Sequence, residues 1–218
     1  MTSDELIRAV DQADSADALL DAVEALANAR VEEAIPTLIQ VLGFNNPGAA
    51  VAAVDGLIAL GTPAVTALLG QLDGYNYGAR AWAVRVLSGV GDPRSLEILL
   101  DAAVSDFALS VRRAAARGLG TIQWEQLPIE QVPSAQERVF QALMQVSQDP
   151  EWIVRYAAIV GLQGLADSVQ RNPAQEQPIW SQQATECLTE IITTDETLAV
   201  QARAQLALQF ISSEAARN

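Results

Sequence analysis

Two tyrosines and one arginine stand close together in this chain, within the segment Tyr75-Asn76-Tyr77-Gly78-Ala79-Arg80. Arginine can form paired hydrogen bonds with a carboxylate, and an aromatic ring can stack on a flat conjugated group. Trp82 follows two residues later and adds another ring. These residue types predict a ligand site rather than a centre of acid and base chemistry. The candidate binding residues are Tyr75, Asn76, Tyr77, Arg80 and Trp82.

The residues around this segment predict how it is positioned. Gly74, Asn76 and Gly78 tolerate positive φ angles, so they predict a turn that brings both tyrosines to a helix entrance. From Arg80 to Val90 small and apolar residues recur at helical spacing, which predicts a helix with one closely packed face. Trp82 lies off that face, and its position leaves open whether it points to the concave surface or to the preceding helix.

Several kinds of chemistry are absent from the composition. The chain has no histidine and one cysteine, Cys187, so it lacks the commonest zinc ligand, the commonest general base and any internal disulfide. Cys187 lies at helical spacing among apolar residues and is predicted to be a small core residue. We expect no metal site, and the sequence assigns no catalytic residue.

The charge of the chain also restricts its partners. A net charge of -14 and a sequence pI near 4.2 give a surface that repels phosphate backbones, so nucleic acid is not expected as a partner. No stretch approaches the roughly 18 apolar residues that a membrane-spanning helix needs. The N-terminal sequence MTSDELIRAV lacks the basic start and apolar run of a signal peptide. We therefore expect a cytoplasmic protein.

The helix that carries Arg80 recurs along the chain. If the equivalent residue in each copy is position x, position x+3 is always alanine and position x+7 is always leucine. The six residues at position x are Leu19, Ala50, Arg80, Arg112, Arg155 and Gln201. The intervals are 30 to 32 residues in the first copies and 43 and 46 in the last two, a spacing typical of helical-pair repeats with insertions.

This register predicts an all-α solenoid of about six units that forms a single domain over residues 1–218. Residues 1–18 are predicted to form an N-terminal helix. Two polar, proline-bearing insertions, near 121–134 and 166–180, account for the longer intervals. Loops of this kind gather at one edge of a solenoid, where a partner could bind.

The fourth and fifth units resemble HEAT repeats through the sequences SDFALSVRRAA and QDPEWIVRYAA. In that family an aspartate in the turn and an arginine at the helix start often form a ladder along the stack. Arg112 and Arg155 match this pattern, and Arg80 aligns with them. Gly74 stands where the ladder aspartate is expected, which favours a ligand role for Arg80 but leaves the ladder role open.

The segment from Tyr75 to Arg80 and the repeats on both sides resemble the smaller, F-type subunits of the E/F-type phycobilin lyases of cyanobacteria. The resemblance covers most of the chain, and the six-residue segment is its most specific part. It implies a heterodimer with a larger E-type subunit. It also implies attachment of phycocyanobilin, an open-chain tetrapyrrole, to a cysteine of the phycocyanin alpha subunit through a thioether bond.

This resemblance agrees with the chemistry that the chain lacks. The ethylidene group of a bilin is already electrophilic and the acceptor supplies the thiol, so a lyase mainly has to hold and orient the pigment. No cofactor is then needed beyond the bound substrate. Related lyases that also isomerise the pigment have a His-Cys pair in the turn that corresponds to Tyr75–Arg80. This chain has neither residue there, so the resemblance implies simple addition.

Two other functions stay open at this stage. A HEAT-like adaptor or chaperone without pigment would have the same composition and repeats, and a related protein could detach pigment during phycobilisome degradation. Trp124, Trp152 and Trp180 lie in or beside the insertions, where tryptophan anchors either an interface or a loop against the core.

Overall fold

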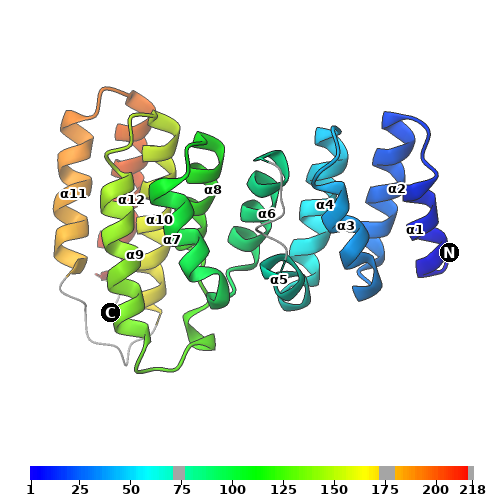
Figure 1. Cartoon of the computed structure of the whole chain (residues 1–218). Helices are drawn as coiled ribbons and strands as arrows, with labels where there is room; N and C mark the ends of the chain where they lie inside the picture. Colours follow the sequence, from blue (N-terminus) through cyan, green and yellow to red (C-terminus); the bar gives the residue numbers. More distant parts are fainter. Residues whose placement is uncertain (71–76, 172–179, 216–218) are drawn as a thin grey trace. The chain divides into compact units, whose positions relative to one another are not determined.

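The computed structural model describes residues 1–70, 77–171 and 180–215. Every regular element within these ranges is helical, which confirms the predicted all-α class (Figure 1). The helices form two compact units, Met1–Ser95 and Leu96–Asn218. The single domain over residues 1–218 stays a prediction.

The first unit consists of helices in two rows. Its elements are α1 (Ser3–Asp11), α2 (Ala16–Ala29), α3 (Ile35–Val41), α4 (Pro47–Leu60), α5 (Thr62–Leu69) and α6 (Tyr77–Val90), with 3-10 turns at Glu32–Ala34 and Pro93–Ser95. Helix α4 packs between α2 and α6, and α3 packs against α5 (Figure 1). This is the arrangement of stacked helical pairs that the repeat register predicts.

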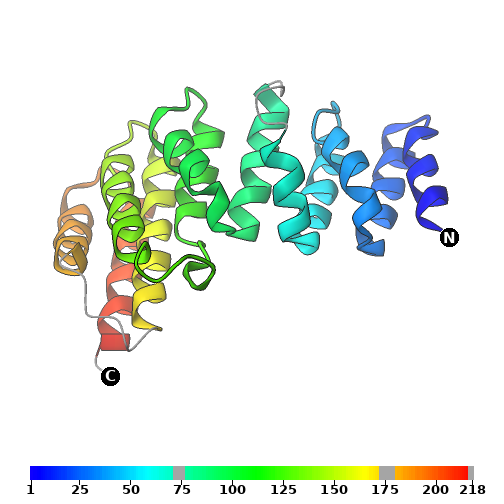
Figure 2. The ribbon, with the colours of Figure 1, turned by 60° about the horizontal axis from the view of Figure 1, so that its bottom comes forward.

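The second unit repeats this plan with longer helices. It contains α7 (Leu96–Ser105), α8 (Leu109–Leu119), a 3-10 turn at Trp124–Gln126, α9 (Val132–Val146), α10 (Trp152–Gln170), α11 (Trp180–Thr194) and α12 (Leu198–Ala215). Helix α10 packs between α8 and α12, while α9 packs between α7 and α11, and Figure 2 shows these two rows from a second direction.

The alanines and leucines of the repeat register form the core. At position x+3, the five alanines from Ala53 to Ala204 are fully buried. At position x+7, the five leucines from Leu26 to Leu162 are at most 1% exposed. Small side chains at x+3 let neighbouring helices approach closely, and the leucine one turn later fills the space beside them. Only the terminal copies, Ala22 and Leu208, are half-buried.

The first helix is shorter than predicted. Thr2 caps α1 in a capping box: its Oγ1 accepts from the backbone N–H of Glu5, and the Glu5 carboxylate accepts from the backbone N–H of Thr2 at 2.8 Å. The helix ends at Asp11, however, and Ser15 caps the next helix. Residues 1–18 therefore hold α1 and the start of α2, because two capping residues fall within this short segment.

In each of the first three repeats, the chain reverses direction between its two helices at a residue with a positive φ angle. Arg30, Gly61 and Gly91 have φ angles of 51°, 69° and 71°, and all three lie at position x+11. A left-handed residue after a helix ends it and redirects the chain, and glycine adopts this conformation without a steric penalty.

The two predicted insertions differ in the structure. In the first, a 3-10 turn at Trp124–Gln126 precedes α9, which begins at Val132. In the second, residues 166–170 continue α10, so the loop predicted there begins later. Buried Ala166 and Val169 keep this last turn on the core, although its polar neighbours give it the composition of a loop. Residues 172–179 lie outside the described part of the chain.

The tryptophans beside the insertions have different surroundings. Trp180 is 2% exposed and stacks on Phe140 with ring centroids 5.4 Å apart, and Trp124 is 8% exposed, so both anchor their segments against the core. Trp152 begins α10 and remains 44% exposed.

Candidate functional site

The predicted ligand segment lies at the start of α6, partly outside the described ranges. Tyr75, Asn76 and the side chain of Tyr77 lie outside the part of the chain that the structure describes. Tyr77 and Gly78 belong to the first turn of α6, whereas the sequence places both in the preceding turn. A helix start at Tyr77 agrees with the sequence, because the preceding residue, Asn76, is of a type that favours the N-cap position.

Arg80 and Trp82 occupy the first turns of the same helix. Both are half-buried, and Ala79, directly before Arg80, is 3% exposed. The guanidinium carbon of Arg85 lies 4.7 Å from the centre of the Trp82 ring, which is a cation–π contact. One face of Trp82 is therefore already covered by a side chain of its own helix.

A small pocket adjoins Trp82 in the first unit. It has a volume of about 280 Å³ and lies between the start of α6, at Gly78, Ala79 and Trp82, and the loop Leu42–Pro47. Trp82 therefore lies beside the loop of the preceding repeat, and whether it points to the concave surface or to the preceding helix stays open. The pocket is smaller than the roughly 300–1,000 Å³ typical of small-molecule sites, so it can hold only part of a large ligand.

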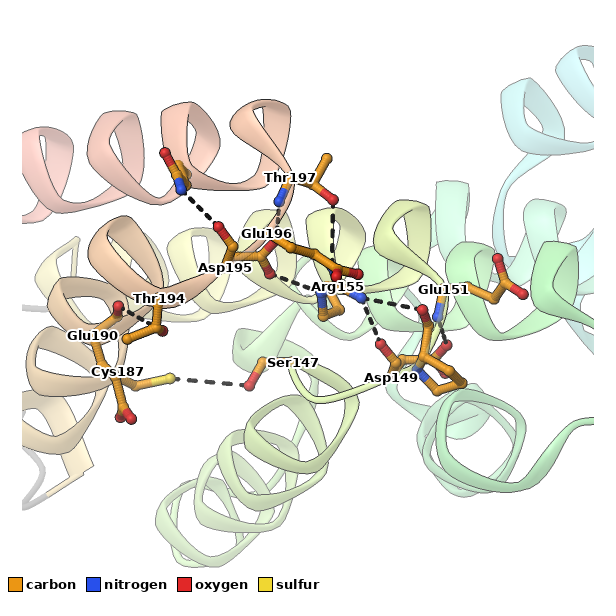
Figure 3. Close-up of polar contacts among 12 residues, drawn as sticks. Ser147, Asp149, Glu151, Arg155, Cys187, Glu190, Thr194, Asp195, Glu196 and Thr197 are labelled. Atoms are coloured by element: carbon orange, nitrogen blue, oxygen red, sulfur yellow. Dashed lines mark hydrogen bonds and ion pairs between the residues drawn. The ribbon is translucent and has the colours of Figure 1, made fainter.

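The predicted ladder arginines pair as the HEAT resemblance implies. The Nε atom of Arg112 donates to Asp149 Oδ2 at 2.7 Å. The Nε atom of Arg155 donates to Asp195 Oδ2 at 2.7 Å (Figure 3). The side chains of Arg155 and Asp195 are 10% and 7% exposed. We call these two pairs the Asp–Arg ladder.

Within the ladder, the backbone carbonyl and the side-chain carboxylate of an aspartate bond to different arginines, which the sequence does not show. The aspartate six residues before each arginine offers its backbone carbonyl: Arg112 Nη1 donates to Asp106 O at 2.9 Å, and Arg155 Nη1 to Asp149 O at 3.0 Å. The paired carboxylate belongs to the following repeat. The ladder thus joins consecutive repeats through the arginine.

Glycine at position 74 does not prevent Arg80 from taking the ladder role. A backbone carbonyl does not depend on the side chain, so glycine at position 74 is no reason to assign Arg80 to a ligand. Asp149 pairs with Arg112, and Asp195 pairs with Arg155. The aspartate at the same place in the repeat that follows Arg80 is Asp106. A ligand role for Arg80 therefore has to be tested by mutation.

Three aspartates, Asp73, Asp92 and Asp106, stand shortly before helical segments, and the side chains of two of them accept a backbone hydrogen bond there. The Asp92 Oδ1 atom accepts from the backbone N–H of Arg94 at 2.9 Å, and Asp106 Oδ1 accepts from that of Ala108 at 2.9 Å. The Arg94 guanidinium also pairs with Asp92, lowering the pKa of that carboxyl, and donates to Thr66 on α5. Asp73 lies outside the described residues.

Cys187 is a core residue, as predicted. It is 7% exposed, and its sulfur lies 3.9 Å from Ser147 Oγ (Figure 3). Burial raises the pKa of the thiol, which disfavours the reactive thiolate. In the ranges that the structure describes, no three acidic, cysteine or histidine side chains gather as a metal site would require.

The described helices do not have the length and composition of a membrane span when taken singly. No single one is long and apolar enough to cross a bilayer, and only the pair α4 and α5, bent by 116°, meets the length and composition when taken together.

Comparison with known proteins identifies the repeats. Residues 65–163 match the family described as HEAT repeats, and residues 15–44 match the PBS lyase HEAT-like repeat. The chain is 57% identical over 173 residues to the phycocyanin alpha phycocyanobilin lyase CpcF of Synechocystis sp., covering 78% of this chain and 81% of the relative. The chain belongs to the family of phycocyanobilin lyase beta subunits. Another such beta subunit, from Pseudanabaena tenuis, is 52% identical over 96% of this chain and 73% of the relative.

A solved structure of this lyase family has the same fold. It is the complex of CpcE and CpcF of phycocyanin lyase from Nostoc sp., with a TM-score of 0.70 and 49% identity over 80% of this chain and 98% of the other. The helical pairs of this chain are therefore those of a phycocyanobilin lyase beta subunit. The HEAT-like solenoid predicted from the register is confirmed.

Proposed function

We propose that this chain is the smaller subunit of a heterodimeric bilin lyase. The lyase joins phycocyanobilin to a cysteine of the phycocyanin alpha subunit through a thioether bond. The observation that carries the proposal is the 57% identity with the Synechocystis protein named phycocyanin alpha phycocyanobilin lyase.

The proposed partner is a larger, E-type subunit. A Nostoc chain that is 49% identical to this one occurs in a complex of CpcE and CpcF. Exposed apolar side chains on α12, Leu198 at 78% and Leu206 at 59%, suit a chain that contacts another protein. We expect this chain alone to bind bilin weakly and to transfer none.

The proposed reaction is an addition. The acceptor thiolate attacks the ethylidene group, a sulfur–carbon bond forms, one carbon–carbon double bond of the bilin is consumed, and a proton is taken up by the pigment. The lyase need not supply the nucleophile, in keeping with buried Cys187. Its task is to hold the pigment in the reactive orientation, and positioning alone can provide a large part of a rate enhancement.

For this chain the proposed bilin-binding residues belong to α6 or directly precede it in the sequence. They are Tyr75, Asn76, Tyr77, Arg80 and Trp82. The proposal includes no cofactor besides the bilin itself and assigns no catalytic residue. It places the reaction in the cytoplasm, where the acceptor cysteine stays reduced.

One experiment separates this function from the two alternatives. The chain, its larger partner and phycocyanobilin are mixed with colourless phycocyanin alpha subunit, and the acceptor is examined for colour after denaturation. We expect covalent colour. An adaptor would leave the acceptor colourless, and a detaching factor would instead release pigment from an acceptor that is already coloured.

A further inference from the structure

A large pocket lies in the second unit, away from the predicted α6 segment in sequence. It has a volume of about 970 Å³ and is bounded by the insertion Gly120–Pro133 on one side and by α10 on the other. Sites that bind small molecules commonly span roughly 300–1,000 Å³, so this pocket is large enough for an extended ligand.

Close helix packing puts the insertion over α10. A Cβ atom added to Gly164 would clash with the backbone of Gly120, and one added to Gly161 would clash with the carbonyl of Ala116. Because these glycines have no side chains, the end of α8 rests directly on the middle of α10. The insertion that leaves α8 at Gly120 is thereby held above the last two turns of α10.

Part of the inner surface of the pocket is apolar and aromatic, beside polar residues such as Gln123 and Glu125. The side chains of Ile122, Trp124 and Val132 line it and are at most 8% exposed, so they form a fixed floor. Ile129 also lines it but is 79% exposed. An apolar ligand in the pocket would cover this residue, and the hydrophobic effect would favour that burial.

The opposite wall carries a polar pair at the C-terminal end of α10, where Arg171 is the C-cap residue. Asp167 and Arg171 are one helical turn apart, both line the pocket, and they form an ion pair. The Arg171 side chain is 76% exposed and that of Asp167 is 21% exposed. Arginine has five N–H donors and a carboxylate can accept several hydrogen bonds, so the pair retains capacity for a ligand. The proposed ligand contacts do not include the Ser168 hydroxyl, because it already donates to Leu165 O at 2.6 Å.

We propose that this pocket binds the open-chain tetrapyrrole, with Arg171 on a propionate, Asp167 on the pyrrole N–H groups and the conjugated plane over the floor at Trp124. This inference rests on the proposed lyase function. A bilin offers a carboxylate, a row of N–H donors and a flat apolar surface, and the pocket presents a matching group for each. The α6 segment presents an arginine and aromatic residues, but no acidic side chain within it.

Two substitutions test the pocket without disturbing the core. Arg171→Gln removes the charge of an exposed side chain, and Asp167→Asn keeps the shape of the carboxylate but removes its charge. A hydrogen bond to a charged group contributes enough to expect about a tenfold rise in the Kd for each variant. The Kd of phycocyanobilin is measured by its absorbance change on titration with the heterodimer of this chain and the larger subunit.

The matched control is Arg138→Gln. Arg138 is an exposed arginine that pairs with Glu97 at 2.6 Å on the other helix row of the same unit, outside this pocket. We expect it to bind phycocyanobilin as the wild type does. Melting temperatures of all variants verify that the fold is unchanged.

Covalent transfer by the wild-type heterodimer is measured in the same preparations. If the wild type binds and transfers bilin while Arg171→Gln and Asp167→Asn bind with unchanged Kd, the pocket assignment is overturned and the lyase function stands. If the wild type neither binds nor transfers bilin, both are overturned. Weaker binding by the two pocket variants, with a normal Arg138→Gln control, supports the pocket.

Discussion

Arg155 on α10 donates two hydrogen bonds to Asp195, at 2.7 and 3.1 Å, and so connects the repeat of α10 to the repeat of α12 (Figure 3). The same guanidinium donates to the carbonyl oxygens of Asp149 and Pro150. The Arg155 side chain therefore donates hydrogen bonds both to carbonyl oxygens of the loop before its own helix and to the carboxylate of the next loop. Arg112 makes the equivalent bonds to Asp149 and Asp106.

Removing one partner from this pair should destabilise the second unit. We expect Arg155→Ala to lower the free energy of unfolding by about 3 kcal/mol, because it leaves the Asp195 carboxylate buried without its counter-charge. Denaturant unfolding measures the effect. Arg138→Ala removes an arginine from an exposed pair and should cost less than about 1 kcal/mol. Equal losses in the two variants would show that the ladder contributes no more than a surface pair.

The same pair predicts a dependence of stability on pH. Hydrogen bonds from Arg155 lower the pKa of Asp195 below its usual 3.8, and they outweigh the opposing effect of burial. A carboxyl with a lowered folded-state pKa stabilises the protein above 3.8, and this contribution is lost as the pH falls through the folded-state value. Wild type and Asp195→Asn should therefore differ most near neutral pH and converge below about pH 4. Unfolding curves with a constant difference down to pH 3 would contradict this.

The repeat register could be predicted from sequence because it depends on local spacing. Alanine at x+3 and leucine at x+7 are sufficient to place the core, and Thr2 with Glu5 is sufficient to place the start of α1. An element boundary is predicted wrongly where composition and burial disagree. Residues 166–170 are largely polar, yet Ala166 and Val169 hold them in α10.

The partners of the ladder and the pocket could not be predicted in the same way. An aspartate six residues before an arginine indicates a local pair, whereas the pairing carboxylate comes from the following repeat. The pocket depends on glycines of α8 and α10 that bring Trp124 and Arg171 to the same cavity. Both are tertiary relationships, and the spacing of residues within a helix does not contain them.

Arg80 is the residue for which the ligand and ladder roles have to be separated. We expect Arg80→Ala to reduce bilin transfer per folded heterodimer about tenfold, as the loss of a charge-assisted bond to a propionate would. Its melting temperature should fall less than that of Arg155→Ala. A variant that unfolds as Arg155→Ala does, while its folded fraction transfers normally, would instead assign Arg80 to the ladder.

The pigment on the product should be phycocyanobilin. Moving a double bond along the conjugated chain requires a group that shuttles protons or adds reversibly near neutral pH, as histidine and cysteine do. The Tyr75–Arg80 segment has neither, and Cys187 is buried on α11 in the second unit. We expect the acid-denatured product to absorb as a phycocyanobilin adduct. Absorption well to the blue, as for phycoviolobilin, would contradict simple addition.

The most direct test of the lyase function is the intact mass of the phycocyanin alpha subunit after incubation with phycocyanobilin. With both lyase subunits present, the acceptor should gain the mass of one whole phycocyanobilin, because addition expels no leaving group. The Cys187→Ala heterodimer should give the same gain. Either subunit alone should give none. An unchanged acceptor mass with both subunits present, or a full gain with this chain alone, would contradict a heterodimeric bilin lyase.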